Sequence, residues 1–214
     1  MSEKRDILSE VFFMDSTSKL ARPIIEAAVK LFKLNGFEHV SVNDICKEAG
    51  IARSSFYRVF SCKKDIINFI LQDARTNHNA AIDDLLDAKN DFERMWNLCD
   101  RLLSVVLDFG PELTASLLSM ELEEPIGILD VIHGMDPWLI KLARNAQQSG
   151  ILLNPEPPER FIPLVSDLVY QVTYNWCRSR GSYSLRRKAR SAAEIVLYVA
   201  PEYRMSPEEF NRLA

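Results

Sequence analysis

The chain has 214 residues, with 47% apolar and 26% charged residues and a formal net charge of −4. This composition is typical of a folded protein of one or two domains and excludes disordered and collagen-like classes. No apolar run reaches the about 18–20 residues that a membrane-spanning helix needs, and the opening residues MSEKRDILSEVFF lack the features of a secretory signal. We therefore expect a cytoplasmic protein with no membrane partner.

The four cysteines are widely spaced and form neither a CxxC pair nor a Cys/His ligand pattern. We therefore predict no disulfide, no metal site and no cofactor, and we interpret the thiols as buried or bystander groups.

Charge is unevenly distributed along the chain. Residues 19–64 hold nine basic and four acidic residues, which gives +5, whereas residues 79–214 hold 14 basic and 20 acidic residues, which gives −6. A basic block attached to an acidic body is a weak indication of a nucleic-acid partner, because the distribution of charge matters more than its sum.

The pattern is helical nearly throughout, which predicts an all-α fold. Residues 1–17 form an N-terminal extension that is either a short amphipathic helix or a mobile arm. A first clear helix covers residues 23–35 and stops at Asn35-Gly36. Ser41 caps a second helix over 42–49, which Gly50 ends, and a third helix, ARSSFYRVF, follows almost at once.

The remaining chain predicts longer helices. A fourth runs from about Cys62 to residue 88, and others cover 91–109, 111–122, 136–149, 158–178 and 184–199, before a short tail helix that starts at Ser206-Pro207. We divide the chain into the extension, a three-helix DNA-binding domain at 18–64 and a larger helical domain at 65–214.

A helix, a short helix, a tight glycine turn and another short helix form the geometry that places one helix in a DNA major groove. Residues 41–60 therefore predict a helix-turn-helix. Arginine can bind guanine edges, and serine and tyrosine can bind base edges or phosphates. The outward side chains of the third helix are Arg53, Ser54, Ser55, Tyr57 and Arg58.

Residues 24–67, IIEAAVKLFKLNGF-(x)3-SVNDICKEAGIARSSFYRVFSCKKDII, resemble the DNA-binding domain of TetR-type bacterial repressors. The resemblance implies that Ser41, Tyr57 and Lys63 hold phosphates, and that Arg53, Ser54 and Ser55 face bases. Three departures leave the base preference open: this chain has Ala52 where Ser or Thr is common, Ser54 where Gly is common, and Cys62 where Ser is usual.

The resemblance further implies a homodimer that binds double-stranded DNA as a transcriptional repressor and is released from a pseudo-palindromic operator by an unknown small-molecule effector. The helices at 158–178 and 184–199 would pack against the partner's. Large side chains of the second domain are interpreted mainly as core and interface, but some would line an effector pocket. The pocket candidates are Trp96, Leu103, Phe109, Met120, Trp138, Tyr170 and Tyr174.

Other features favour structural roles. His39 is interpreted as a backbone-contacting or surface residue, and His78 and His133 lack the partner spacing of a metal or catalytic site. The basic run from Arg178 to Arg190 is interpreted as solvated charge or as partners for acids, with binding of an anionic ligand as the alternative. No Ser/His/Asp or Cys/His constellation, phosphate loop or catalytic carboxylate pair is present, so we predict that the protein is not an enzyme. An alternative is an interaction protein that keeps the fold and acts through a protein partner.

Overall fold

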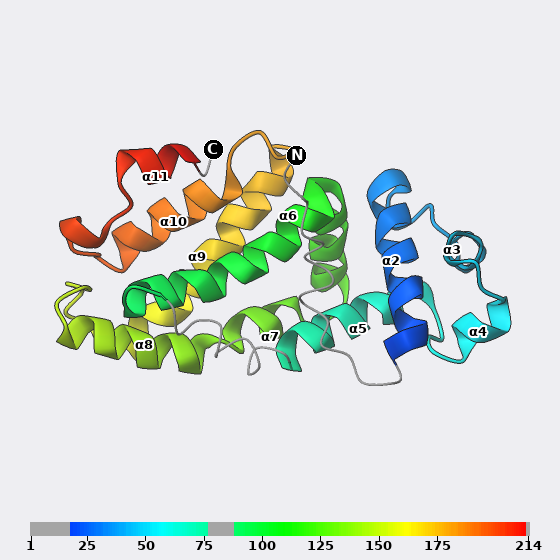
Figure 1. Cartoon of the computed structure of the whole chain (residues 1–214), viewed down its shortest axis with the longest axis horizontal. Coiled ribbons are helices and arrows are strands. Elements are labelled where there is room, and N and C mark those ends of the chain that lie inside the picture. Colours follow the sequence, from blue (N-terminus) through cyan, green and yellow to red (C-terminus); the bar gives the residue numbers. More distant parts are fainter. Residues whose placement is uncertain (1–17, 77–87, 213–214) are drawn as a thin grey trace.

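The computed structural model describes residues 18–76 and 88–212, and these form an assembly of helices (Figure 1). The described residues contain no strand beyond one isolated bridge between Leu152 and Val199. The all-α prediction is therefore confirmed. The extension at residues 1–17 and His78 lie outside the described residues.

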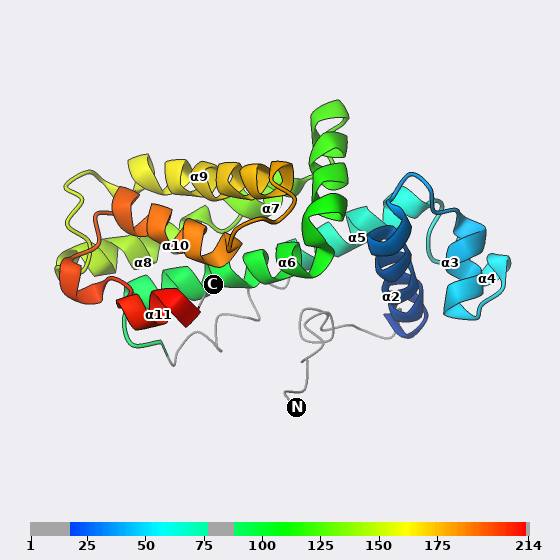
Figure 2. The ribbon, with the colours of Figure 1, turned by 90° about the horizontal axis from the view of Figure 1, so that it is seen from above.

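The N-terminal part consists of α2 (Ser18–Asn35), α3 (Val42–Ala49), α4 (Arg53–Tyr57) and α5 (Lys63–Thr76). Helix α2 begins five residues before the predicted start, and α4 is shorter than the predicted third helix. Phe32, Ile45, Phe56 and Ile66 are almost completely buried where these four helices meet. Figures 1 and 2 show α3 and α4 at one end of the long axis, far from α8 and α10.

The C-terminal part consists of α6 (Asp91–Glu123), α7 (Ile128–His133), α8 (Asp136–Gln148), α9 (Pro158–Arg178), α10 (Leu185–Val196), a 3-10 turn η2 (Pro201–Tyr203) and α11 (Pro207–Arg212). Helices α6, α8 and α9 pack against one another, and α10 lies against α9. Every predicted helix from residue 91 onward has a counterpart, and α7 is an additional helix that the sequence pattern did not predict.

The predicted helices at 91–109 and 111–122 are the two halves of α6, which meet at a kink. Gly110 has non-helical backbone angles (φ 78°, ψ 166°), and Pro111 follows it without an N–H group to donate. The hydroxyl of Thr114 donates across the bend to the carbonyl of Val106, at 3.4 Å. The bend sends the second half of α6 in a new direction, as Figure 2 shows.

Helix α6 contributes to three clusters of buried side chains. Phe109 and Leu113 pack with the N-terminal helices, Phe92 packs with α8 and α9, and Leu103 packs with α9 and α10. Among the described helices, only α6 is long and apolar enough to cross a membrane by length and composition, contrary to the expectation that no segment is. Because ten of its side chains are buried within the protein and its middle is bent, we interpret it as a core helix.

The predicted division at residues 64 and 65 falls within the first turn of α5, whose Ile66, Ile67 and Ile70 belong to the core of the N-terminal helices. The boundary between the domains therefore stays a prediction.

Candidate functional site

The helix-turn-helix is built from local signals. The Ser41 hydroxyl accepts from the Asp44 backbone N–H at 3.2 Å, and the Asp44 carboxylate accepts from the Ser41 backbone N–H at 2.9 Å, so the two residues form a capping box at the start of α3. The Ser41 hydroxyl, which also donates to the Asp44 carboxylate, and the Ser41 backbone N–H lower the pKa of the Asp44 carboxyl, because both hydrogen bonds favour its charged form.

The turn between α3 and α4 depends on one glycine. Gly50 ends α3 in the left-handed conformation (φ 66°, ψ 33°), where a side chain would be strained. The Ile51 N–H then bonds the Cys46 carbonyl at 3.0 Å, and Ala52 begins α4 without a side-chain cap. Phe56 is completely buried beneath α4, so it fixes which face of this short helix is turned outward.

The outward face of α4 carries the predicted DNA contacts. Arg53, Ser54, Tyr57 and Arg58 are exposed and Ser55 is half-buried. The Arg53 guanidinium lies 3.3 Å from the Tyr57 hydroxyl and 5.6 Å from the centre of the Tyr57 ring. That contact raises the pKa of Arg53. The structure places these residues together at one end of the molecule (Figure 1).

Ser41 and Lys63 lie in a different situation from the α4 residues. The Ser41 hydroxyl is already engaged with Asp44, donating to its carboxylate at 2.6 Å. The Lys63 ammonium donates to the carbonyls of Phe37 at 2.7 Å and Glu38 at 3.2 Å, and lies 4.4 Å from the centre of the Phe37 ring. In this state both groups stabilise the domain internally, and their phosphate contacts stay predictions.

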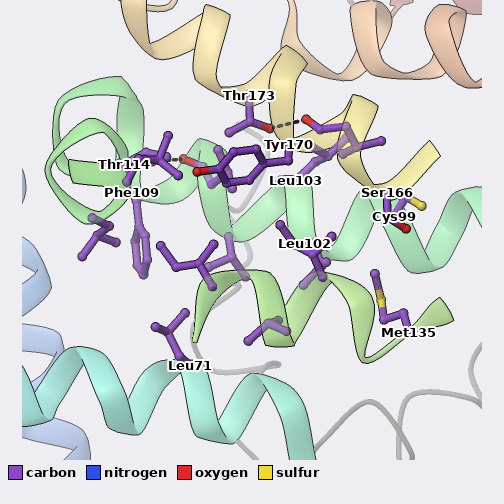
Figure 3. A pocket seen from close by; sticks show the side chains of 18 of the residues that line it. Leu71, Cys99, Leu102, Leu103, Phe109, Thr114, Met135, Ser166, Tyr170 and Thr173 are labelled. Carbon is purple, nitrogen blue, oxygen red and sulfur yellow. Dashed lines mark hydrogen bonds between the residues drawn. The ribbon is translucent and has the colours of Figure 1, made fainter. Parts of the chain in front are cut away.

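A second candidate site is an apolar cavity of about 130 Å³ beside the bend of α6. Helices α5, α6, α7, α8 and α9 line it (Figure 3). Leu103, Phe109 and Tyr170 are pocket candidates that line this cavity. Ile70 and Leu71 reach it from α5, so the helix that follows the helix-turn-helix forms part of its wall.

Four other pocket candidates lie outside the cavity lining. Trp138 and Tyr174 are both 38% exposed, so their rings point toward the surface. Trp96 lies against the Arg190 guanidinium, 5.1 Å from the ring centre, and Met120 packs against the core of the N-terminal helices. These four side chains therefore contact other parts of the protein or solvent and do not line the cavity.

The sequence analysis did not identify three hydroxyl-bearing residues of the cavity lining, Thr114, Ser166 and Thr173. Ser166, Val169, Tyr170 and Thr173 recur at helical spacing along one face of α9 and all line the cavity. A pair of hydroxyl residues seven apart on an apolar helix was the available signal. The pocket candidates were chosen mainly among large aromatic side chains instead.

The carboxylate of Glu121, which the sequence reading did not single out, fixes α7 beside the cavity. It is buried and accepts from three consecutive backbone N–H groups, those of Ile126 at 2.8 Å, Gly127 at 3.0 Å and Ile128 at 3.2 Å. These are groups at the start of α7 that would otherwise lack partners. Helix α7 has no N-cap side-chain bond of its own, so this distant carboxylate holds its beginning.

His133 and two arginines of α10 lie next to carboxylates. His133 lies between two carboxylates, 3.0 Å from Asp136 and 3.2 Å from Asp167, and no metal-binding cluster is present in the described parts of the chain. Arg190 is buried, with only 4% of its side chain exposed, and pairs with Glu93 and Glu194. Arg186 pairs with Asp100 at 2.6 Å. The expectation that some of these arginines pair with acids is confirmed.

The comparison with known families identifies the N-terminal part. Residues 24–69 match the family model described as "Bacterial regulatory proteins, tetR family". The chain is 32% identical over 87 residues to the uncharacterized HTH-type transcriptional regulator YvdT of Bacillus subtilis (strain 168), covering 41% of this chain and 43% of that relative. It is 36% identical over 88 residues to the HTH-type transcriptional regulator SAUSA300_2515 of Staphylococcus aureus (strain USA300), covering 40% and 46%. The match therefore spans less than half the length of these curated relatives.

Solved structures extend the likeness to nearly the whole fold. The fatty acid degradation regulator FadR from Bacillus halodurans superposes with a TM-score of 0.65 at 20% identity, covering 83% of this chain and 94% of that chain. FadR from Bacillus subtilis, solved in complex with stearoyl-CoA, gives a TM-score of 0.64 at 20% identity, covering 82% and 97%. At this identity the likeness concerns the fold.

Proposed function

We propose that the chain is a dimeric transcriptional regulator of the TetR family, a repressor that a small molecule releases from a pseudo-palindromic operator, because residues 24–69 match the model of that family. The observation that carries the proposal is the exposed face of α4, with Arg53 and Tyr57 in contact above a fully buried Phe56. A short helix fixed from below and basic on its outer face is suited to a major groove.

Dimerisation is proposed through α9 and α10. Both lie at the surface and carry large exposed apolar side chains, with Leu164 61% exposed on α9 and Ile195 72% exposed on α10. Burying such side chains against a second copy would favour association. Two α4 helices would then lie about 34–36 Å apart and enter successive major grooves on one face of the DNA.

The effector site is proposed to be the cavity between α5 and α9. Because α5 contributes to both the cavity wall and the core of the DNA-binding helices, a ligand can favour one position of α4 over another. Such a ligand acts only if it binds the two arrangements with different affinity.

The test is fluorescence anisotropy of the purified, ligand-free protein with the DNA flanking its own gene, repeated over a range of salt concentrations. We expect salt-sensitive binding to a specific segment, with a stoichiometry of one dimer per site. Absence of any salt-sensitive binding would refute the proposal. Absence of DNA binding together with a captured protein partner would favour the interaction-protein alternative, although the capping box of α3, the glycine turn and the basic face of α4 are all intact.

The proposed setting of this activity is the cytoplasm, where a regulator of this kind meets the bacterial chromosome. No catalytic role is proposed, since the family consists of regulatory proteins.

A further inference from the structure

We propose that the cavity between α5 and α9 takes an uncharged, mostly apolar molecule that carries one hydrogen-bond acceptor, and that the Tyr170 hydroxyl donates to this acceptor. The inference rests on the proposed function only in treating the cavity as an effector site. It concerns which chemistry of ligand the cavity accepts, and binding can be measured without DNA.

The charge of the lining carries the first step. Among the described residues that line the cavity, none is Lys, Arg, His, Asp or Glu. Cys99 lines it as a neutral thiol, because burial raises its pKa to about 12. An ionised ligand group would lose its water there without gaining a partner charge, which is costly.

The hydroxyl groups of the lining carry the second step. The Thr173 hydroxyl donates to the Val169 carbonyl at 3.0 Å, the Ser166 hydroxyl to the Asp136 carboxylate at 2.7 Å, and the Thr114 hydroxyl to the Val106 carbonyl. The protons of Ser166 and Thr173 are committed within the protein, and the Thr114 proton is directed to Val106 in a longer hydrogen bond of 3.4 Å. Since a hydroxyl has a single proton, these side chains have none left to donate to a ligand.

Tyr170 differs from the other three. Its hydroxyl makes no hydrogen bond with any residue in the described part of the chain, and Figure 3 shows the ring lying along the cavity with the hydroxyl directed toward Thr114. Burial, with a further contribution from the Glu121 charge, raises the pKa of Tyr170, so its proton stays in place. A half-buried phenol with a free proton is suited to a carbonyl or ether oxygen.

Glu121 adds a reason for rejecting anions at this end of the cavity. Its carboxylate is held by the three N–H groups at the start of α7, and its charge acts on Tyr170. A carboxylate ligand bound to the Tyr170 hydroxyl would therefore be repelled by Glu121 in a site of low dielectric constant.

Three probes of similar shape separate the effect of ligand charge from the effect of a hydrogen-bond acceptor. A cavity of about 150 Å³ can hold benzene, so single-ring molecules suit this one. Acetophenone is neutral with one acceptor, benzoate has nearly the same shape but carries a charge, and ethylbenzene has no acceptor. Binding of each to the full-length protein without DNA is measured by isothermal titration calorimetry.

We expect acetophenone to bind at least about tenfold more tightly than benzoate, because the benzoate charge has no partner in the lining. Tyr170→Phe should weaken acetophenone binding about three- to tenfold, which corresponds to one neutral hydrogen bond, and should leave ethylbenzene binding unchanged. Tyr174→Phe is the matched control, because Tyr174 lies on the same helix, is 38% exposed and does not line the cavity.

The proposal is overturned if benzoate binds as tightly as acetophenone, if acetophenone does not bind, or if Tyr170→Phe leaves acetophenone binding unchanged. These outcomes leave the proposed DNA-binding function standing, since that function is measured with the ligand-free protein. Conversely, loss of DNA binding with intact acetophenone binding would refute the proposed function and retain the ligand assignment.

Discussion

The Tyr57 hydroxyl lies 3.3 Å from the Arg53 guanidinium, one helical turn along α4, so the two exposed side chains restrain each other. An arginine held in one position loses less conformational freedom when it binds a base edge. We therefore expect Arg53→Ala to reduce the preference for the operator over unrelated DNA by about 1–3 kcal/mol.

The matched control for Arg53→Ala is Tyr57→Phe, which removes only the hydroxyl. It should reduce operator affinity by less than Arg53→Ala does, since the ring still lies beside Arg53. Anisotropy with operator and scrambled DNA measures both. Equal losses on operator and scrambled DNA for Arg53→Ala would show that Arg53 contacts phosphate and not bases.

Lys63 is predicted to have two roles that can be separated. Lys63→Ala removes its hydrogen bonds to the Phe37 and Glu38 carbonyls and its contact with the Phe37 ring, so it should destabilise the protein by about 1–2 kcal/mol in urea unfolding.

If Lys63 also binds a phosphate, the same variant should reduce the slope of log affinity against log salt by about one. A variant that loses stability but keeps the full salt slope would restrict Lys63 to the structural role. Lys63→Arg, which keeps the charge, is the control for the slope.

The capping box predicts a pH dependence of stability. Because the pKa of Asp44 is lowered in the folded state, its charged form stabilises folding above its unfolded pKa, and this contribution is lost as the pH falls through the folded pKa. Asp44→Asn should therefore lower Tm at pH 7, and the difference in Tm should shrink as the pH is lowered below the ordinary pKa of an aspartate. Circular dichroism melts of both proteins measure this, and a Tm difference that stays the same as the pH falls would contradict it.

Glu121 is expected to be important for stability, although it neither lines the cavity nor lies on α4. Glu121→Ala leaves three backbone N–H groups at the start of α7 without a partner, and we expect a loss of about 2–4 kcal/mol in urea unfolding. Glu121→Gln keeps one acceptor oxygen and should lose less. If the alanine and glutamine variants were equally stable, the N–H groups would not depend on this side chain.

The arginines of α10 should differ according to their burial. Arg190→Ala leaves Glu93 and Glu194 without their buried partner, and breaking such a pair typically costs about 3–5 kcal/mol. Arg186→Ala breaks a pair whose side chains are 31% and 32% exposed, so we expect a loss of less than about 1 kcal/mol. Urea unfolding measures the loss of stability in each variant. A loss for Arg186→Ala that equals or exceeds the loss for Arg190→Ala would show that burial of the ion pair does not control its contribution.

The N-terminal helices were predictable because their signals are local. Ser41 caps α3, Gly50 turns the chain, and the apolar spacing of α2 marks its buried face, so each signal lies within a few residues of the element that it specifies. The exposed residues of α4 follow from Phe56, whose burial sets the orientation of that helix.

Features that depend on distant residues were not predictable in this way. Helix α7 has six residues and no cap of its own, and its start depends on Glu121 from α6. The cavity likewise depends on which helices meet, so its lining came largely from aliphatic and hydroxyl residues of α6 and α9. Trp138 and Tyr174, chosen for their size, face the surface instead.

The bend at Gly110 has a consequence for how the molecule unfolds. Because the two halves of α6 are joined directly at the bend, residues of this one element take part in the core of the DNA-binding helices and in both C-terminal clusters. Melting either end of α6 exposes apolar side chains that the other helices need, which couples the regions energetically. The two ends of this protein should therefore denature together in a single cooperative transition. A destabilising substitution at one end should lower the melting temperature that is measured for both ends.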